Sequence, residues 1–227
     1  MRIGILQPGY LPWLGFFEQL AKVDIFVLYD DVQYTTKDWR SRNKIKTANS
    51  SIWLTVPTHG SQQLLINEVK LVQDNVWKKK HLKSIELSYK KAPYFDWLMP
   101  DLERIINKEL KYLIDLDSEL ITMLANKIGI KTNIINSSSL NIQQPDKNIK
   151  IIETIKALDG TYFYDGKSSQ EFIDVPLFNQ HGITVEFQDY KHPTYPQLWG
   201  TFVPYLSVID LLFNVGEESF KYIINKN

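Results

Sequence analysis

The chain has no cysteine among its 227 residues, and this absence excludes several chemistries at once. Disulfide cross-links, thiolate nucleophiles and cysteine-ligated zinc sites all require a thiol. Histidine is scarce as well, and no two of the four histidines have the one-turn spacing of a helical metal pair. A Gly-X-Ser-X-Gly elbow is also missing. We therefore expect neither a zinc site nor a cysteine or serine hydrolase.

The sequence also lacks a charge excess and long apolar runs. Lys plus Arg and Asp plus Glu both number 26, whereas a non-specific nucleic-acid binder needs a basic surplus. No stretch approaches the roughly 18 apolar residues that cross a bilayer. The apolar run at the N-terminus is interrupted by Gln7 and Pro8, so it is too short for a signal peptide. We expect a cytoplasmic protein without membrane insertion and without a nucleic-acid partner.

The spacing of apolar residues predicts an α/β fold. Strands are predicted at 2–6, 25–29, 51–57, 66–72, 131–135, 161–164 and 183–187. Helices are predicted at 12–23, 75–89, 94–108, 110–128, 146–158, 203–213 and 217–224. Alternating strands and helices favour a mostly parallel, Rossmann-like sheet, which begins with a right-handed strand–helix–strand unit. We expect one domain over 1–227, with 74–128 as a helical subdomain.

Two residues are predicted to delimit helices in this subdomain. Asp74 precedes the helix at 75–89, and its side-chain oxygen can accept from the exposed amides of the first turn. Gly129 follows the helix at 110–128 and suits a C-cap. By contrast, the segment 34–50 is polar and basic, and no strand or helix is assigned to it.

Polar residues follow the first two predicted strands directly. Ligands of parallel sheets bind at the carboxyl ends of the strands, so these residues are expected to surround one pocket. They are Gln7, Tyr10, Asp30, Asp31 and Gln33. Asp30 and Asp31 are the candidate catalytic carboxylates and would hold sugar hydroxyls. A magnesium ion on this pair is less favoured, and a purely structural role in capping the loop stays open.

A second candidate element follows the strand at 161–164. Lys167, Ser168 and Ser169 open a predicted helical turn, where free amides attract anions and the side chains supply further donors. The segment is a candidate phosphate site, although it lacks the glycine spacing of a Walker A loop. A capped turn with a solvated lysine is the alternative.

His81 is the candidate general base, because an imidazole titrates near neutral pH. It lies one helical turn from Trp77 on the predicted helix at 75–89. A surface or capping histidine is the alternative, and His192 is the second candidate.

Further residues are candidates for substrate binding. Aromatic side chains in Gly- and Pro-containing loops cannot join a regular core, so they are expected to line a ligand surface. They include Tyr10, Trp13 and Tyr195. Arg40 and Arg42 are candidate partners for Asp30, and Asp210 and Asn214 lie one helical turn apart. An exposed apolar face on 206–214 would permit a homodimer.

Several stretches resemble the WbqC-like family of bacterial proteins. They comprise ILQPGYLPWLGFF at 5–17, VDIFVLYDDVQY at 23–34, WRSRN at 39–43, HLKSI at 81–85, YKKAPYF at 89–95 and FVPYLSVIDLLFNVG at 202–216. Asn43 and Tyr89 lie within these stretches and are further candidate substrate-binding residues. The resemblance implies a role in the biosynthesis of O-antigen or another surface polysaccharide.

A weaker resemblance concerns nucleotidylyltransferases with a HIGH motif, which also open with a strand, a Pro/Gly loop and a helix. Here the motif's place is taken by Trp13-Leu-Gly-Phe16, which keeps the glycine and has aromatics instead of both histidines. This degenerate N-terminus implies a shared architecture and puts adenylyl transfer by the usual chemistry in doubt.

Three functions remain as hypotheses. The first is a transferase that places an acyl or aminoacyl group on a nucleotide-activated amino sugar, with no certain cofactor. The second is a nucleotidyltransferase with a degenerate HIGH motif, and the third is a non-catalytic protein that binds a nucleotide-sugar.

Overall fold

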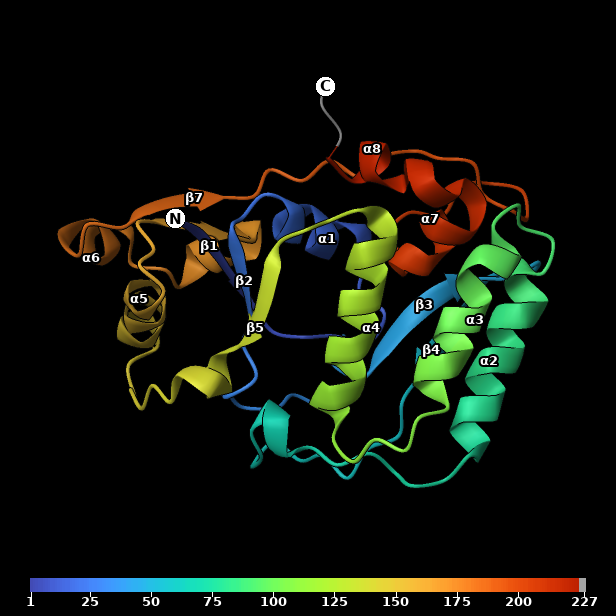
Figure 1. Ribbon diagram of the computed structural model, residues 1–227, viewed down its shortest axis with the longest axis horizontal. Coiled ribbons are helices and arrows are strands. Elements are labelled where there is room, and N and C mark those ends of the chain that lie inside the picture. The colour runs from blue at the N-terminus through green and yellow to red at the C-terminus, as the bar shows by residue number, and fades with distance from the viewer. Residues whose placement is uncertain (225–227) are drawn as a thin grey trace.

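A five-stranded parallel sheet organises one half of the protein (Figure 1). The computed structural model describes residues 1–224. The strands are β1 (Arg2–Leu6), β2 (Ile25–Leu28), β5 (Asn133–Asn136), β6 (Tyr162–Asp165) and β7 (Thr184–Phe187). Every neighbouring pair is parallel, in the order β5-β2-β1-β6-β7. The predicted α/β fold with a Rossmann-like parallel sheet is confirmed.

The strand order contains one reversal of direction. From β1 the chain adds β2 and then β5 on one side of the sheet. It then returns to the other side of β1 and adds β6 and β7. The connections therefore diverge between β1 and β6, and this is where open parallel sheets leave a crevice for ligands.

Side chains alternate across the sheet and supply two separate cores. Ile3 and Ile5 belong to a cluster that includes apolar residues of α5 (Lys147–Ala157) and α6 (Val175–Gln180). Phe26 and Leu28 belong to the opposite cluster, which includes the apolar residues of α1 (Leu14–Ala21). The near-continuous apolar sequence of these strands follows from burial on both faces.

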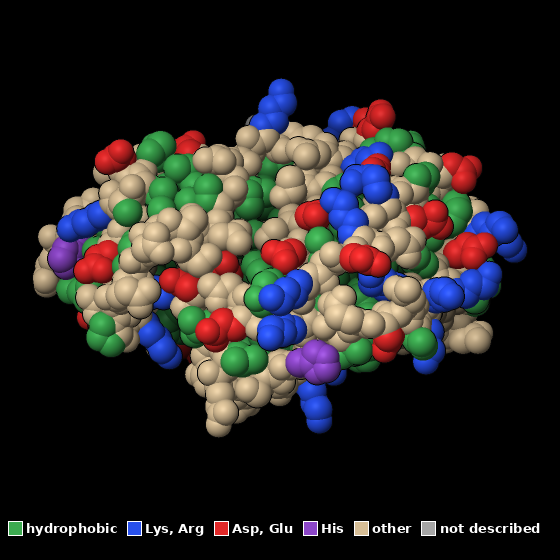
Figure 2. All heavy atoms as spheres, turned by 60° about the horizontal axis from the view of Figure 1, so that its bottom comes forward, with side chains coloured by type: hydrophobic (Ala, Val, Ile, Leu, Met, Phe, Trp, Pro, Cys, Tyr) green, Lys and Arg blue, Asp and Glu red, His purple; other side chains and the backbone are tan. Residues whose placement is uncertain are grey.

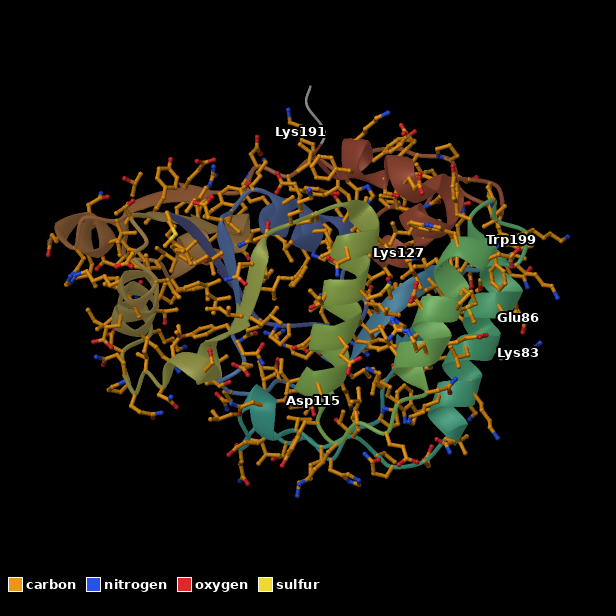
Figure 3. The ribbon with its side chains drawn as sticks, in the orientation of Figure 1. Lys83, Glu86, Asp115, Lys127, Lys191 and Trp199 are labelled. Atoms are coloured by element: carbon orange, nitrogen blue, oxygen red, sulfur yellow. The ribbon has the colours of Figure 1, made fainter. Side chains whose placement is uncertain are left out.

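The second cluster continues into the helical half of the molecule (Figure 1). This half contains the hairpin β3 (Arg42–Lys46) and β4 (Ser51–Thr55), together with α2 (Val76–Tyr89), α3 (Phe95–Ile106), α4 (Leu113–Ile128), α7 (Val208–Val215) and α8 (Ser219–Ile224). Trp199 lies beside α2 (Figure 3), where its indole N–H donates to the Ser88 carbonyl at 2.8 Å. One hydrophobic cluster thus joins the sheet to the helices.

Both predicted helix-delimiting residues have the expected roles. The carboxylate of Asp74 accepts from the amides of Val76 (2.9 Å) and Trp77 (3.4 Å) at the start of α2. Gly129 ends α4 with φ 90°, in the left-handed region that glycine adopts without steric cost.

The expected strand at 66–72 is wrong. Its first residues form a 3₁₀ turn, Ile66–Glu68, because the Glu68 carboxylate accepts from the Leu65 amide at 2.8 Å. The later residues make only single bridges with separate segments, as in the bond from the Leu71 amide to the Lys111 carbonyl. No repeating ladder forms, so the alternation of side chains is not strand pairing.

Two other segments differ from expectation. The polar segment 34–50 contains the strand β3. Its regular structure comes from pairing with β4 rather than from a pattern in its own sequence. The helix expected from 203 begins at Val208 instead. The preceding Tyr205 has φ 57°, and the Ser207 side chain caps the new helix by accepting from the Ile209 amide.

Acidic and basic side chains are interspersed over the face in Figure 2, without a large area of one sign. Within residues 1–224, none of the helices has both the length and the apolar character needed to cross a membrane.

Candidate functional site

A pocket of about 520 Å³ opens at the carboxyl ends of β1 and β6. Its walls come from the loop after β1, the start of α1, the loops after β6 and β7, and the segment that leads into β3. The volume falls in the usual range for small-molecule sites. The pocket therefore lies at the reversal between β1 and β6, as the strand order requires.

Two cations from different segments line this pocket. Arg40 comes from the segment before β3, and Lys167 comes from the loop after β6. The Arg40 guanidinium pairs with Asp38 at 2.8 Å, but its Nε–H is buried without a partner. No lining residue is an Asp or Glu. The charge at the surface of the pocket thus favours an anionic ligand.

Buried amides connect the elements beneath the pocket. The Gln188 side chain, just after β7, donates to the Gly15 carbonyl at 2.8 Å and to the Glu18 carboxylate at 2.5 Å. Glu18 also accepts from the Tyr164 hydroxyl and pairs with Lys22. The charge of Glu18 is therefore compensated beneath the lining, and the network links α1 to β6 and β7.

Aromatic rings form one wall of the pocket. Trp13 contacts Tyr190 edge-on, with ring centroids 4.9 Å apart, and lies 5.9 Å from the Tyr205 ring. The Trp13 indole also covers Gly15, where an added Cβ would come within 2.3 Å of the ring. Burial and the charge of Glu18 raise the pKa of the Tyr190 hydroxyl, which has no hydrogen-bond partner among the described residues. The wall is therefore an apolar aromatic surface with one polar group, the Tyr190 hydroxyl.

Several predicted binding residues meet in this pocket. Gln7, Trp13, Arg40, Asn43, Lys167 and Ser168 all line it. The Asn43 amide is already engaged, because its nitrogen donates to the Leu11 carbonyl at 2.7 Å and its oxygen accepts from the Lys44 amide. Ser169 is buried and donates to the Gly166 carbonyl at 2.7 Å, so it closes the turn that presents Lys167 and Ser168.

Asp30 and Asp31 lie elsewhere, on the far side of β1 from the pocket. Asp30 is buried, and its carboxylate accepts four hydrogen bonds. The donors are the Ser137 hydroxyl (3.0 Å), the backbone amide (2.9 Å) and hydroxyl (2.8 Å) of Ser138, and the side-chain amide of Asn136. Asp31 pairs with Lys150 at 2.8 Å. Neither carboxylate lines the pocket with Gln7, and donors from β5 and the residues after it satisfy both. The pair joins β2 to β5.

Tyr10 and His81 are in the core rather than on the pocket wall. The Tyr10 hydroxyl lies 2.9 Å from His81 Nδ1, and His81 Nε2 lies 3.1 Å from the Thr55 carbonyl. Because a carbonyl only accepts, Nε2 carries the proton and Nδ1 accepts from Tyr10. Burial lowers the pKa of His81 to about 4. The imidazole is neutral and fully hydrogen-bonded, and neither residue lines the pocket.

Comparison with known proteins places the chain in a family. The profile of the WbqC-like protein family matches residues 7–222, which include every pocket residue except Leu6. The chain belongs to the WbqC-like family. This WbqC-like protein is also 34% identical to the uncharacterized protein Rv1507c of Mycobacterium tuberculosis over 229 residues, which cover 98% of this chain and 97% of that protein. No protein of solved structure matches it.

The remaining predicted residues of the WbqC-like protein lie outside the pocket. A buried network centres on Asp210, which accepts from Tyr89 (2.8 Å), Tyr195 (3.0 Å) and Gln197 (2.7 Å). Burial raises the pKa of the Asp210 carboxyl. The Asn214 side chain donates to the Asp210 carbonyl within the same helix. These residues fasten α7 to α2 and the 195–198 loop.

Three other predicted residues have separate positions. Gln33 is exposed, and its side chain donates to the Gln62 carbonyl at 2.7 Å. The Arg42 guanidinium lies 4.3 Å from the centre of the Trp53 ring, on the hairpin. His192 is also engaged at both nitrogens, since Nδ1 meets the Pro193 carbonyl and Nε2 accepts from the Tyr205 amide.

Sequence reasoning missed Gln188, Tyr190, Tyr205 and Trp39 as pocket residues of the WbqC-like protein. A signal for Gln188 was present, because it follows a predicted strand directly, as Gln7 does. Trp39 and Tyr205 carried no comparable local signal, since only packing brings their loops to the sheet. Within residues 1–224, no group of three or more His, Asp or Glu side chains is arranged to hold a metal ion.

Proposed function

We propose that this protein is a transferase that acts on a nucleotide-activated amino sugar in surface-polysaccharide biosynthesis. The observation that carries the proposal is the pair Arg40 and Lys167, two cations that line a pocket without a carboxylate in its lining. A diphosphate in this pocket would accept charge-assisted hydrogen bonds from both. The aromatic wall suits the ring of the attached sugar.

The proposed reaction forms an amide on the sugar. The amine nitrogen bonds to the acyl or aminoacyl carbon, the bond from that carbon to the leaving group of the donor breaks, and the leaving group departs with the proton that the amine loses. Arg40, Lys167 and Ser168 hold the diphosphate, while Gln7 and the Trp13 wall orient the sugar. His81 takes no part in this proton transfer, because both ring nitrogens are occupied in the core.

Calorimetric titration with UDP, dTDP, GDP, CMP and their amino-sugar conjugates tests the binding site. We expect at least one conjugate to bind equally well with and without EDTA, because Arg40 and Lys167 rather than a metal ion would hold the diphosphate. Arg40→Met and Lys167→Met should each weaken binding about tenfold, the effect of one charge-assisted hydrogen bond. Lys83→Met is the matched control, because this exposed lysine pairs with Glu86 on α2, outside the pocket (Figure 3). Unchanged affinity in both pocket variants would refute the proposal.

A second candidate is a non-catalytic protein that binds a nucleotide-sugar. One observation favours it: the pocket lining includes neither a histidine nor a carboxylate that could accept a proton. Mass spectrometry of the bound amino sugar, after incubation with an acyl-coenzyme A donor, separates the two candidates. An added acyl mass supports the transferase, and tight binding of an unchanged sugar across acyl and aminoacyl donors supports the second candidate.

A further inference from the structure

Two tryptophans on the outside of the hairpin region extend the aromatic surface beyond the pocket. Trp39 and Trp53 expose 47% and 42% of their surface, and their ring centroids are 5.4 Å apart. Indole rings are usually buried against apolar neighbours, and a contiguous exposed pair often marks an interaction site. Trp39 also lines the pocket, so the pair is continuous with it.

Two cations accompany this pair. The Arg42 guanidinium lies 4.3 Å and the Lys44 ammonium 4.8 Å from the centre of the Trp53 ring. Lys44 is directly opposite Trp53 in the antiparallel register of β3 and β4. Neither cation forms an ion pair in the described part of the chain, and the Nε–H of Arg42 is buried without a partner. The ring attracts the cations but leaves their charge unneutralised.

The backbone fastens the tryptophan pair to the pocket. The Tyr10 amide donates to the Trp39 carbonyl at 3.1 Å, next to the loop that contains Gln7. Gly9 permits this approach, because a Cβ at that position would lie 2.7 Å from the Trp39 carbonyl oxygen. A ligand that extends out of the pocket past Arg40 therefore meets a surface with a fixed position.

We propose that Trp39, Trp53, Arg42 and Lys44 form a second subsite, the hairpin subsite, that binds an acidic sugar. The C–H face of a pyranose packs on the indoles, and the carboxylate or phosphate of the sugar binds Arg42 and Lys44. This inference rests on the proposed function for the class of ligand, a sugar, whereas the subsite itself is defined by its own four side chains. A neutral sugar leaves the two cations unpaired and binds less well.

Indole resonances in ¹H–¹⁵N spectra test the subsite directly. The probes are a glucuronate-containing trisaccharide and glucose 1-phosphate, which separate a carboxylate from a phosphate, with maltotriose and glucose as neutral counterparts. We expect either acidic probe to shift the Trp39 and Trp53 signals and to bind at least about fivefold more tightly than its neutral counterpart. The Trp199 signal should stay in place, because that indole donates to the Ser88 carbonyl beside α2.

Variants complete the test. Trp53→Ala and the double variant Arg42→Met/Lys44→Met should each weaken the acidic probe at least about fivefold, while Lys83→Met should not. Nucleotide-sugar affinity should be the same in all of them. Loss of nucleotide-sugar binding in Trp53→Ala would overturn the second subsite, because the tryptophans would then belong to the nucleotide-sugar site.

The two proposals fail in different ways. If no nucleotide-sugar binds but acidic sugars still shift Trp39 and Trp53, the proposed function fails and the hairpin subsite stands. If nucleotide-sugars bind and no acidic probe shifts either indole, the hairpin subsite is refuted and the proposed function stands. Equal binding of acidic and neutral probes also refutes the subsite, because the cations would then contribute nothing.

Discussion

Replacing His81 with glutamine should make the protein less sensitive to acid. Burial lowers the pKa of His81 to about 4, against about 6.5 for an exposed imidazole. The unfolded chain therefore takes up the proton first. The stability from neutral His81 is complete above pH 6.5 and is lost as the pH falls towards 4. This pKa difference corresponds to about 3 kcal/mol, of which about 2 kcal/mol is lost at pH 5.

Urea unfolding followed by tryptophan fluorescence at pH 7.5, 6 and 5 provides the measurement. The wild-type protein should lose about 2 kcal/mol more of its unfolding free energy over this interval than His81→Gln does. His181→Gln is the control, because His181 is exposed. The comparison with a variant is necessary, because burial raises the pKa of Asp117, Asp165 and Asp210. The raised pKa values of these carboxyl groups have the opposite effect. They make the folded state more stable at low pH than at neutral pH, so the unfolding free energy falls as the pH rises.

Two results would contradict this reasoning. The first is an NMR titration in which the His81 ring has a midpoint near 6.5, as an exposed imidazole has. The second is an unfolding free energy that changes equally with pH in His81→Gln and in the wild-type protein. Either result would mean that water reaches the ring in spite of its bonds to Tyr10 and Thr55.

Three further substitutions have expected outcomes. Gly15→Ala should weaken nucleotide-sugar binding and lower the unfolding free energy by about 1–3 kcal/mol, because the new methyl group collides with the Trp13 ring; Gly166→Ala, with no atom within 4 Å of its Cβ, is the matched control in urea unfolding. Asp30→Ala should lower the unfolding free energy by about 2–3 kcal/mol, because it leaves the Ser138 amide unpaired, and an accompanying loss of ligand affinity in calorimetry would restore Asp30 to the site. Asp117→Asn should be more stable than wild type at pH 7 and nearly equal to it at pH 3 in urea unfolding, because both carboxyl oxygens of Asp117 are buried without a partner and burial raises its pKa; equal stability at pH 7 would contradict this.

Much of the fold follows from local patterns. The opening strand, helix and strand are visible in apolar runs, and Asp74 and Gly129 delimit helices through interactions with neighbouring residues. The same holds for part of the pocket. Gln7 comes directly after a buried strand and Lys167 two residues after another, and parallel strands end at a common edge. These inferences need only the order of residues along the chain.

The choice of strands that border the pocket is not local. Whether β2 or β6 faces the pocket depends on the strand order, which is decided when the connections pack on the two faces of the sheet. Asp30 shows the consequence, because Ser137 and Ser138, more than one hundred residues later in the chain, satisfy its carboxylate. A buried carboxylate after a strand has the same sequence signal whether it meets donors or a ligand.

By itself, then, the sequence determined a parallel α/β sheet with polar residues at the carboxyl ends of its strands, because burial and hydrogen bonding within short segments dictate both. Only the tertiary structure decided that Gln7 shares a pocket with Arg40 and Lys167 rather than with Asp30. That outcome depends on contacts between segments far apart in the chain, where many pairings satisfy the same local pattern and packing selects one of them.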